Sequence, residues 1–166
     1  FDSPNFPPLL EAGIQIQLVA GTLGNPSGKP LQLHAVTPQP IGVVTLYPGI
    51  SFEVIANLLR QPVKALILLT YGVGNAPQDE RLLGQLREAS KRGVILLNLS
   101  QCLRGRVNMG GYATGNALAE AGVISGFDMT TEAALTKLHV LLSQDLAPER
   151  IRALMQQDLH GELTAD

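Results

Sequence analysis

The chain has 166 residues, of which 45% are hydrophobic and 16% are charged, and its formal net charge is −2. This size and composition indicate a folded domain with enough apolar residues for a core, and they exclude an intrinsically disordered segment. The net charge predicts neither nucleic-acid binding nor attraction to an anionic membrane. A single cysteine, Cys102, excludes an internal disulfide framework, and no apolar run is long enough to span a bilayer.

The first 40 residues combine prolines with short alternating patterns. Residues 1–12 read as a proline-rich lead-in, cut from a longer polypeptide and packed on a neighbouring domain. Residues 14–18 alternate apolar and polar side chains, which is typical of a half-buried strand. Gly, Pro, Asn and Ser gather in residues 21–30 and predict an exposed loop. Residues 31–36 alternate again and predict a second strand near an edge of the sheet.

Three apolar runs predict strands that are buried on both faces, and these are residues 41–47, 65–69 and 94–99. Helical spacing predicts helices over residues 52–60 with Ser51 as N-cap, 78–92 stopped by Gly93, 116–121, 130–142, and from Pro148 towards residue 159. Strands that alternate with helices indicate an α/β fold. We predict a three-layer, mostly parallel sheet with helices on both faces, a small Rossmann-like domain.

The central stretch of the chain is residues 65–78. Its apolar run leads directly into Gly72, Val73, Gly74 and Asn75, and Pro77 suits the first turn of the next helix. In open α/β sheets, binding sites lie at the carboxyl ends of the strands. An ordinary tight turn explains the same pattern. The loop matches neither the dinucleotide fingerprint nor the phosphate-binding loop, because the third glycine and the Gly-Lys-Ser/Thr ending are absent.

No catalytic constellation emerges from the residues alone. Cys102 follows a buried strand beside Ser100, but no base can be named for it, and a buried free cysteine usually acts as a small hydrophobe. Arg104 and Arg106 lie in a glycine-rich loop over residues 104–112, where they either clamp an anion or face solvent. The histidines are far apart in the sequence and are expected to be surface or core residues: His34, His139 and His160.

Several blocks, spread over the whole chain, resemble the C-terminal domain of cytoplasmic, type I bacterial L-asparaginase. They are residues 37–44 (TPQPIGVV), 47–50 (YPGI), 71–78 (YGVGNAPQ), 108–119 (NMGGYATGNALA), 128–130 (DMT) and 161–164 (GELT). The resemblance implies a two-domain enzyme that forms homodimers or homotetramers and hydrolyses L-asparagine to aspartate and ammonia without a cofactor. It assigns residues 1–27 to a linker and lead-in strand from an N-terminal catalytic domain, and residues 28–166 to the C-terminal domain.

The family's nucleophilic threonine lies in a Thr-Gly-Gly-Thr motif of the N-terminal domain, which residues 21–24 only echo. The resemblance therefore implies that this chain contains no catalytic residue. In periplasmic relatives an Asn-Gly-Asn sequence and a later acidic residue reach the neighbouring active site. Asn75 matches the first asparagine, whereas Pro77 replaces the second and Arg106 falls near the acid.

The type I enzymes are also associated with a second, regulatory asparagine site at the ends of the two central strands. The resemblance places that site at Thr70, Ser100, Gln101 and Cys102. The regulated enzyme has an arginine where Leu69 stands here, and leucine cannot clamp a carboxylate. Two other readings stay open. In the first, the chain is a freestanding amino-acid sensor, and in the second it is a dimerisation domain without catalysis.

Overall fold

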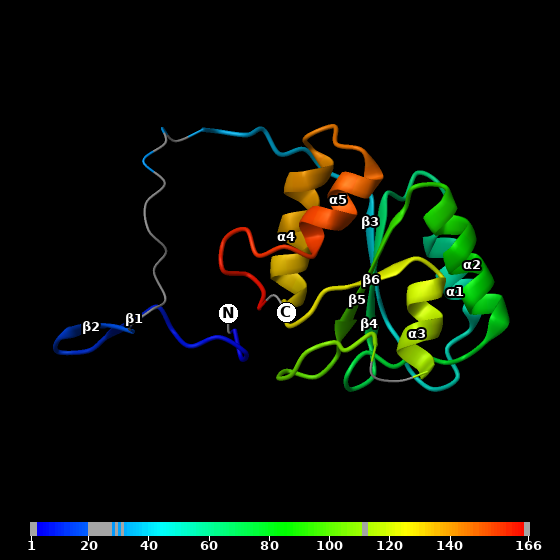
Figure 1. The fold of residues 1–166 in the computed structure, drawn as a ribbon, viewed down its shortest axis with the longest axis horizontal. Coiled ribbons are helices and arrows are strands. Elements are labelled where there is room, and N and C mark those ends of the chain that lie inside the picture. The colour runs from blue at the N-terminus through cyan, green and yellow to red at the C-terminus, as the bar shows by residue number, and fades with distance from the viewer. Residues whose placement is uncertain (1–2, 20–27, 29, 31, 111–112, 165–166) are drawn as a thin grey trace.

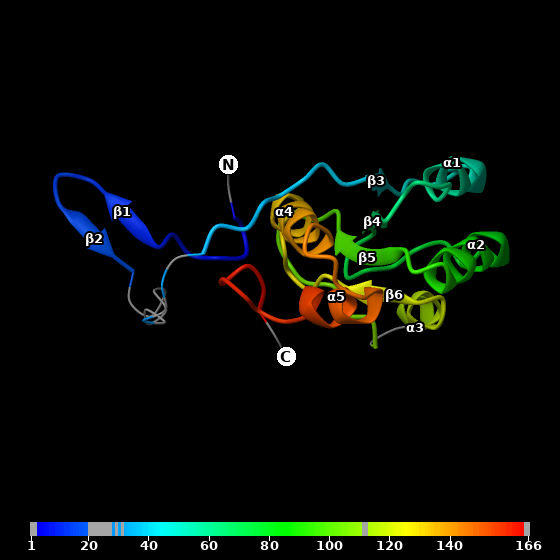
Figure 2. The same cartoon turned by 90° about the horizontal axis from the view of Figure 1, so that it is seen from above.

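The computed structural model describes residues 3–19, 28, 30, 32–110 and 113–164. Within them, the main body is a parallel sheet in the order β3-β4-β5-β6. Its strands are β3 (Ile41–Thr45), β4 (Ala65–Thr70), β5 (Ile95–Ser100) and β6 (Val123–Ser125). Helices α1 (Phe52–Leu58), α2 (Glu80–Lys91) and α3 (Ala113–Glu120) cover one face, while α4 (Thr131–Leu142) and α5 (Pro148–Met155) cover the other (Figures 1 and 2). This arrangement confirms the predicted three-layer α/β fold.

The core lies on both sides of the two central strands, β4 and β5. Successive strand residues point to opposite faces, so Leu66 and Leu96 pack under α1 and α2, while Ile67 and Leu97 pack under α4 and α5. All four side chains have an exposed fraction of 0%. Burial on both faces explains the continuous apolar runs, and the predicted strands 65–69 and 94–99 are confirmed to within one residue at each end.

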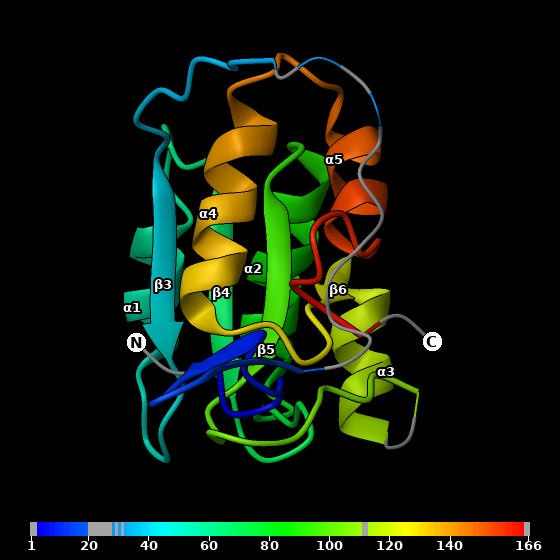
Figure 3. The same ribbon diagram turned by 90° about the vertical axis from the view of Figure 1, so that its left-hand side faces the viewer.

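The two outer strands differ from the sequence expectations. The prediction of a fully buried strand over residues 41–47 is wrong, because β3 ends at Thr45, lies at the edge of the sheet and leaves Val43 39% exposed. At the other edge, β6 has no counterpart among the predicted strands. It has three residues between two glycines and gains its strand geometry from pairing with β5 (Figure 3).

Capping residues set the helix boundaries. Ser51 caps α1 as predicted, its hydroxyl accepting a hydrogen bond from the Glu53 N–H at 3.2 Å. Helix α2 begins at Glu80 because Asp79 is its N-cap, so Pro77 precedes the helix and does not lie in its first turn. Helix α3 begins three residues before its predicted start at residue 116. Helix α5 ends at Met155, and the chain then continues as an irregular tail where helix was expected to residue 159.

The side chains predicted to face inward are covered in helices α1, α2 and α4. The fully buried ones are Ile55, Leu59, Leu82, Leu83, Leu86, Ala89, Ala134, Leu138 and Leu141, and the half-buried ones are Phe52, Leu58, Ala133 and Leu142. The glycine expected to end α2, Gly93, has a φ of +88°, the left-handed conformation that favours glycine after a helix.

None of the described helices is long and apolar enough to cross a membrane.

The described parts of the N-terminal arm, residues 3–19 and 32–40, extend away from the body on the side of α4 (Figures 1 and 2). They contain an antiparallel hairpin of β1 (Leu10–Ala12) and β2 (Ile16–Leu18). The strand predicted over residues 14–18 is confirmed for residues 16–18, but its predicted half-burial is wrong, since Ile16 is 72% exposed and Leu18 64% exposed. The strand predicted over residues 31–36 is absent from residues 32–36, which have no partner strand. Residue 31 and most of the loop predicted over 21–30 fall outside the described residues.

Candidate functional site

The candidate site is the edge of the sheet where β4 and β5 end. The two strands are parallel neighbours, and their last residues, Thr70 and Ser100, are register partners. The loops that follow therefore leave from the same edge. The structure thus brings together the four residues that the resemblance assigned to a second asparagine site: Thr70, Ser100, Gln101 and Cys102.

Thr70 points into the protein at this edge. Its side chain is fully buried, and its hydroxyl lies 2.6 Å from Asn98 Oδ1 and 3.1 Å from the Leu99 carbonyl oxygen. These bonds satisfy the hydroxyl, as a buried polar group requires. Thr70 therefore holds β4 to β5 in this conformation.

Asn98 is a residue that the sequence analysis missed. It is fully buried, and its amide nitrogen donates to the Gly74 carbonyl at 3.0 Å and contacts Met109 Sδ at 3.1 Å. With the bond from Thr70, this side chain joins both central strands to the glycine loop, residues 72–75. The signal in the sequence was the single side-chain amide, that of Asn98, within the apolar run 94–99. When such a run is buried, the amide has to find hydrogen-bond partners.

Ser100 fixes the start of the glycine loop. Its hydroxyl donates to the Gly72 carbonyl at 2.5 Å and accepts from the Cys102 backbone N–H at 3.0 Å. The hydroxyl proton thus faces a carbonyl oxygen and not a base. The Cys102 thiol is exposed.

Gln101 joins the ends of three strands. Its side-chain amide donates to the Leu46 carbonyl at 2.6 Å and to the Leu69 carbonyl at 2.8 Å, and its backbone N–H donates to the Thr70 carbonyl at 2.9 Å. Leu69 itself is half-buried and packs on the apolar cluster beneath α4 and α5. An arginine side chain at position 69 would therefore be half-buried at its base, beside the polar edge of the sheet.

The glycine loop is a tight turn closed by its own backbone. Tyr71 and Asn75 exchange two backbone hydrogen bonds of 2.8 and 2.9 Å, and Asn75 is half-buried at the end of the turn. Gly74 has a φ of +109°, and a Cβ atom there would lie 2.8 Å from Val107 Cγ1. Only glycine allows the turn and the loop after β5 to approach this closely.

The remaining candidate side chains lie outside this edge. The Arg106 guanidinium lies over the Phe127 ring, 5.5 Å from its centroid, and donates to the Thr164 carbonyl at 3.5 Å, while Arg104 is exposed. The three histidines are on separate elements, namely the arm, the last turn of α4 and the C-terminal tail. Among the described residues, no group of three or more His, Cys, Asp or Glu side chains could hold a metal ion.

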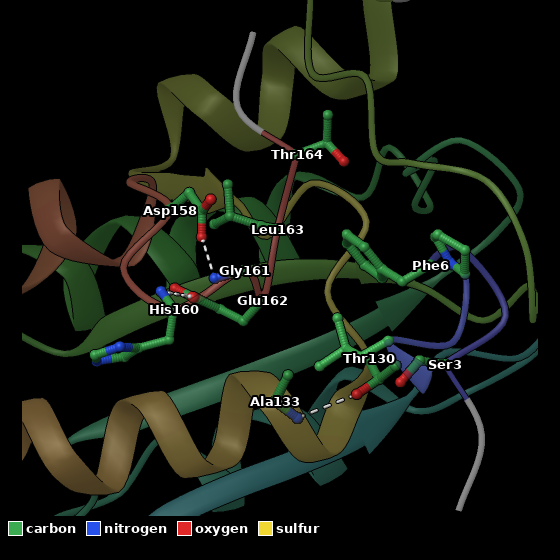
Figure 4. Close-up of a pocket in the computed structure, with 12 residues that line it drawn as sticks. Ser3, Phe6, Thr130, Ala133, Asp158, His160, Gly161, Glu162, Leu163 and Thr164 are labelled. Carbon is green, nitrogen blue, oxygen red and sulfur yellow. Dashed lines mark hydrogen bonds between the residues drawn. The ribbon is translucent and has the colours of Figure 1, made fainter. Parts of the chain in front are cut away.

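A cavity of about 820 Å³ lies between the arm, the start of α4 and the C-terminal tail (Figure 4). Beside it, Lys137 and Glu162 form an ion pair whose side chains are only 6% and 14% exposed. Burial alone would raise the pKa of the Glu162 carboxyl, but Lys137 and the backbone N–H groups of Leu159 and His160 lower that pKa to about 2. The pair holds the tail, residues 156–164, against α4.

Comparison with known proteins shows which family has this arrangement. The family profile described as "Glutaminase/Asparaginase C-terminal domain" matches residues 40–155. L-asparaginase 1 of Escherichia coli K12 is 65% identical over 167 aligned residues, which cover 100% of this chain and 49% of that protein. The crystal structure of L-asparaginase I from Vibrio cholerae O1 biovar eltor is 65% identical, superposes with a TM-score of 0.93, and is matched over 98% of this chain and 49% of its own.

A more distant relative has a different name. The 60 kDa lysophospholipase of Homo sapiens is 42% identical over 166 residues, which are 99% of this chain and 29% of that protein. The chain therefore spans about half the length of the two asparaginases, and less of the lysophospholipase. From the family match and the superposed fold, this chain belongs to the glutaminase/asparaginase C-terminal domain family.

Proposed function

We propose that this chain is the C-terminal half of a type I L-asparaginase, which hydrolyses L-asparagine to L-aspartate and ammonia. The observation that carries the proposal is the 65% identity to E. coli L-asparaginase 1 over the whole chain. The proposed substrate is the one that the name of this relative gives, L-asparagine.

The chemistry of the candidate site supports placing the nucleophile in another domain. A hydroxyl or thiol attacks an amide efficiently only when a base takes its proton and an oxyanion hole receives the developing charge. The Thr70 and Ser100 hydroxyls donate to acceptors that hold the strands and the glycine loop together. Cys102 is exposed, and its backbone N–H donates to Ser100. These hydroxyl contacts are structural.

We assign the arm to contacts outside the body of the domain. Leu10, Ile14, Ile16 and Leu18 are between 46% and 108% exposed on the hairpin. Apolar surface of this kind favours a covering partner. We propose that the partners are the N-terminal catalytic domain and a second subunit, in a homodimer or homotetramer, and that the protein acts in the cytoplasm. Sedimentation of the full-length protein and cell fractionation test these assignments.

The carboxyl edge is our candidate for a regulatory asparagine pocket. Ser100 and the exposed Cys102 lie beside a glycine loop, and backbone N–H groups in such loops suit a carboxylate. Leu69 lacks the guanidinium that would clamp a carboxylate, so we expect the parent to bind asparagine weakly or not at all. Asn75, at the end of the turn, is our candidate for a contact to the neighbouring active site.

Calorimetric titration of asparagine into the parent and the Leu69→Arg variant tests the regulatory pocket. The variant should gain about 1.5–3 kcal/mol of binding free energy from a charge-assisted hydrogen bond. Leu69→Met is the matched control, because it changes the side chain without adding charge. Tight binding by the parent, or equal binding by all three proteins, would mean that the pocket is assigned wrongly.

A domain that binds without catalysing is the second candidate function. What favours it is that the same domain, at 42% identity, occurs in a protein named as a lysophospholipase. Activity assays on the full-length protein distinguish the candidates. Hydrolysis of asparagine supports the asparaginase. Hydrolysis of neither substrate supports the binding domain, and hydrolysis of lysophosphatidylcholine alone would contradict both candidates.

A further inference from the structure

Asn5 joins the N-terminal arm to a loop that follows 100 residues later in the chain. Its amide nitrogen donates to the Gly105 carbonyl at 3.0 Å, and its amide oxygen accepts from the Gly105 N–H at 2.8 Å. The same nitrogen donates to the Asp128 carbonyl at 3.0 Å. Because a carboxamide has the donor and acceptor of a peptide group, Asn5 pairs with Gly105 as one residue of a strand pairs with another.

Gly105 belongs to the β5 loop, residues 101–110, which is attached at four successive positions. Gly105 bonds the arm, and Arg106 donates to the Thr164 carbonyl of the tail at 3.5 Å. The Val107 N–H donates to the Phe127 carbonyl at 2.9 Å, and the Asn108 N–H donates to the Val73 carbonyl at 2.8 Å. The loop thus joins the arm, the tail, the turn before α4 and the glycine loop.

Position 105 favours glycine because of its backbone conformation. Space for a side chain is not the reason. Its φ is +110°, a region that other residues rarely adopt, and a Cβ atom added there would have no neighbouring atom within 4 Å. This backbone conformation presents both the N–H and the carbonyl of Gly105 to the Asn5 carboxamide. The arm and the loop are therefore matched to one another at this one contact.

We propose that Asn5 is a positioning residue that couples the arm to the β5 loop, so that displacement of the arm displaces the loop. The loop begins directly after Ser100, with Gln101 and Cys102. Through it, the arm affects the carboxyl edge of the sheet. The importance of that edge for asparagine rests on the proposed function, whereas the coupling itself does not.

Hydrogen exchange in the full-length protein tests the coupling. In Asn5→Ala, the Gly105 amide loses its acceptor, and we expect it to exchange at least about tenfold faster than in the parent. The matched control is Asn108→Ala, because the Asn108 side chain accepts from Gly110 at 3.2 Å within the loop. The control should leave exchange at Gly105 within about twofold of the parent. Unchanged exchange in Asn5→Ala, or equal acceleration in both variants, would overturn the proposal.

A second variant separates the hydrogen bonds from general loosening. Asn5→Asp retains an acceptor for the Gly105 N–H but places a carboxylate against the carbonyls of Gly105 and Asp128. We expect the arm and the loop to separate in this variant as well, with exchange at Gly105 at least as fast as in Asn5→Ala. Protection equal to that of the parent would contradict the role of the two donated bonds.

Cys102 provides the readout at the carboxyl edge. Its exposed thiol lies three residues before Gly105, and its rate of alkylation by iodoacetamide can be followed by peptide mass spectrometry. We expect the rate to change at least about twofold in Asn5→Ala and to stay constant in Asn108→Ala. A constant rate in both would overturn transmission to the edge. Neither measurement depends on asparagine hydrolysis, so an inactive protein would contradict the proposed function without affecting this test.

Discussion

The body of the domain and the N-terminal arm use similar apolar side chains in opposite ways. In the body, Leu66 and Leu96 are 0% exposed between the sheet and its helices, whereas in the arm Ile14 is 108% exposed and Leu33 is 99% exposed. The body supplies each central strand with neighbours on both sides, and the arm supplies its strands only with each other. The body therefore buries its own apolar residues, while those of the arm are suited to a partner.

Polar contacts hold the arm to the body. Asn5 bonds to Gly105 and Asp128, and at the other end of the arm the Thr37 N–H donates to the Ser143 hydroxyl at 3.1 Å. Hydrogen bonds that exchange with water contribute little net stability each, about 0.5–1.5 kcal/mol. We therefore expect the folding stability of the chain to depend on the body.

Truncating one apolar residue in each region should give the largest contrast. Leu96→Ala removes a fully buried side chain and should lower the free energy of unfolding by about 2–5 kcal/mol. Ile16→Ala, in the exposed hairpin, should change it by less than about 0.5 kcal/mol. Urea unfolding of the isolated chain gives both values. Equal losses in the two variants would break the distinction between body and arm.

Neutralising Glu162 tests whether the tail belongs to the body. Glu162→Gln leaves the Lys137 ammonium without its carboxylate and should cost about 3 kcal/mol at neutral pH, the lower end for a buried pair. The matched control is Glu120→Gln, because Glu120 is exposed. If Glu162→Gln lowered the free energy of unfolding no more than the control does, the tail, like the arm, would not contribute to the stability of the body.

The same pair predicts a dependence on pH. The pKa of Glu162 is about 2 in the folded protein, against the ordinary glutamate value of 4.5 in an unfolded chain, so its stabilisation is complete above about pH 4.5. It is lost as the pH falls towards 2, because the parent carboxyl then also becomes protonated. Urea midpoints of parent and Glu162→Gln should therefore converge as the pH is lowered from 4.5 to 2. A difference that is constant over this range would contradict the ion pair.

Asn98→Ala should give a smaller effect, confined to the carboxyl edge of the body. It removes the donor to the Gly74 carbonyl and one of the two acceptors of the Thr70 hydroxyl, which keeps the Leu99 carbonyl, and an unsatisfied buried polar group costs about 1–3 kcal/mol. Exchange of the amides in residues 72–75 should accelerate more than exchange in the arm. Asn108→Ala is the control, because this asparagine is exposed. Equal acceleration in the arm would show that Asn98 does not act locally.

The sequence patterns predicted the body better than the arm. Apolar runs located β4 and β5, and helical spacing with Ser51 and Gly93 located the start of α1 and the end of α2. Alternation alone predicted a strand that is absent from residues 32–36, because a strand also needs a partner to accept its hydrogen bonds. Strand β6 has only three residues, too few to show a period, and pairing with β5 decides its conformation.

The sequence predicted that the candidate residues meet at one edge of the sheet, but it did not predict their contacts. The parallel order of β4 and β5 places Thr70 and Ser100 together, which the strand–helix alternation implies. The roles of Asn98, Asn5 and Gly105 depend on contacts between distant segments, which no local pattern contains. A resemblance to a family supplied the proposed substrate, because the hydroxyls at the edge donate to structural acceptors and suggest no reaction by themselves.

The most direct test of the proposed function is ammonia release from L-asparagine, measured with the purified 166-residue chain and with the full-length protein side by side. Circular dichroism and urea unfolding first establish that the isolated chain is folded. We expect hydrolysis by the full-length protein and none by the isolated chain, since the nucleophile is assigned to the other domain. Hydrolysis by the isolated chain that is abolished by Ser100→Ala or Cys102→Ala would contradict this assignment and place a catalytic centre at the carboxyl edge.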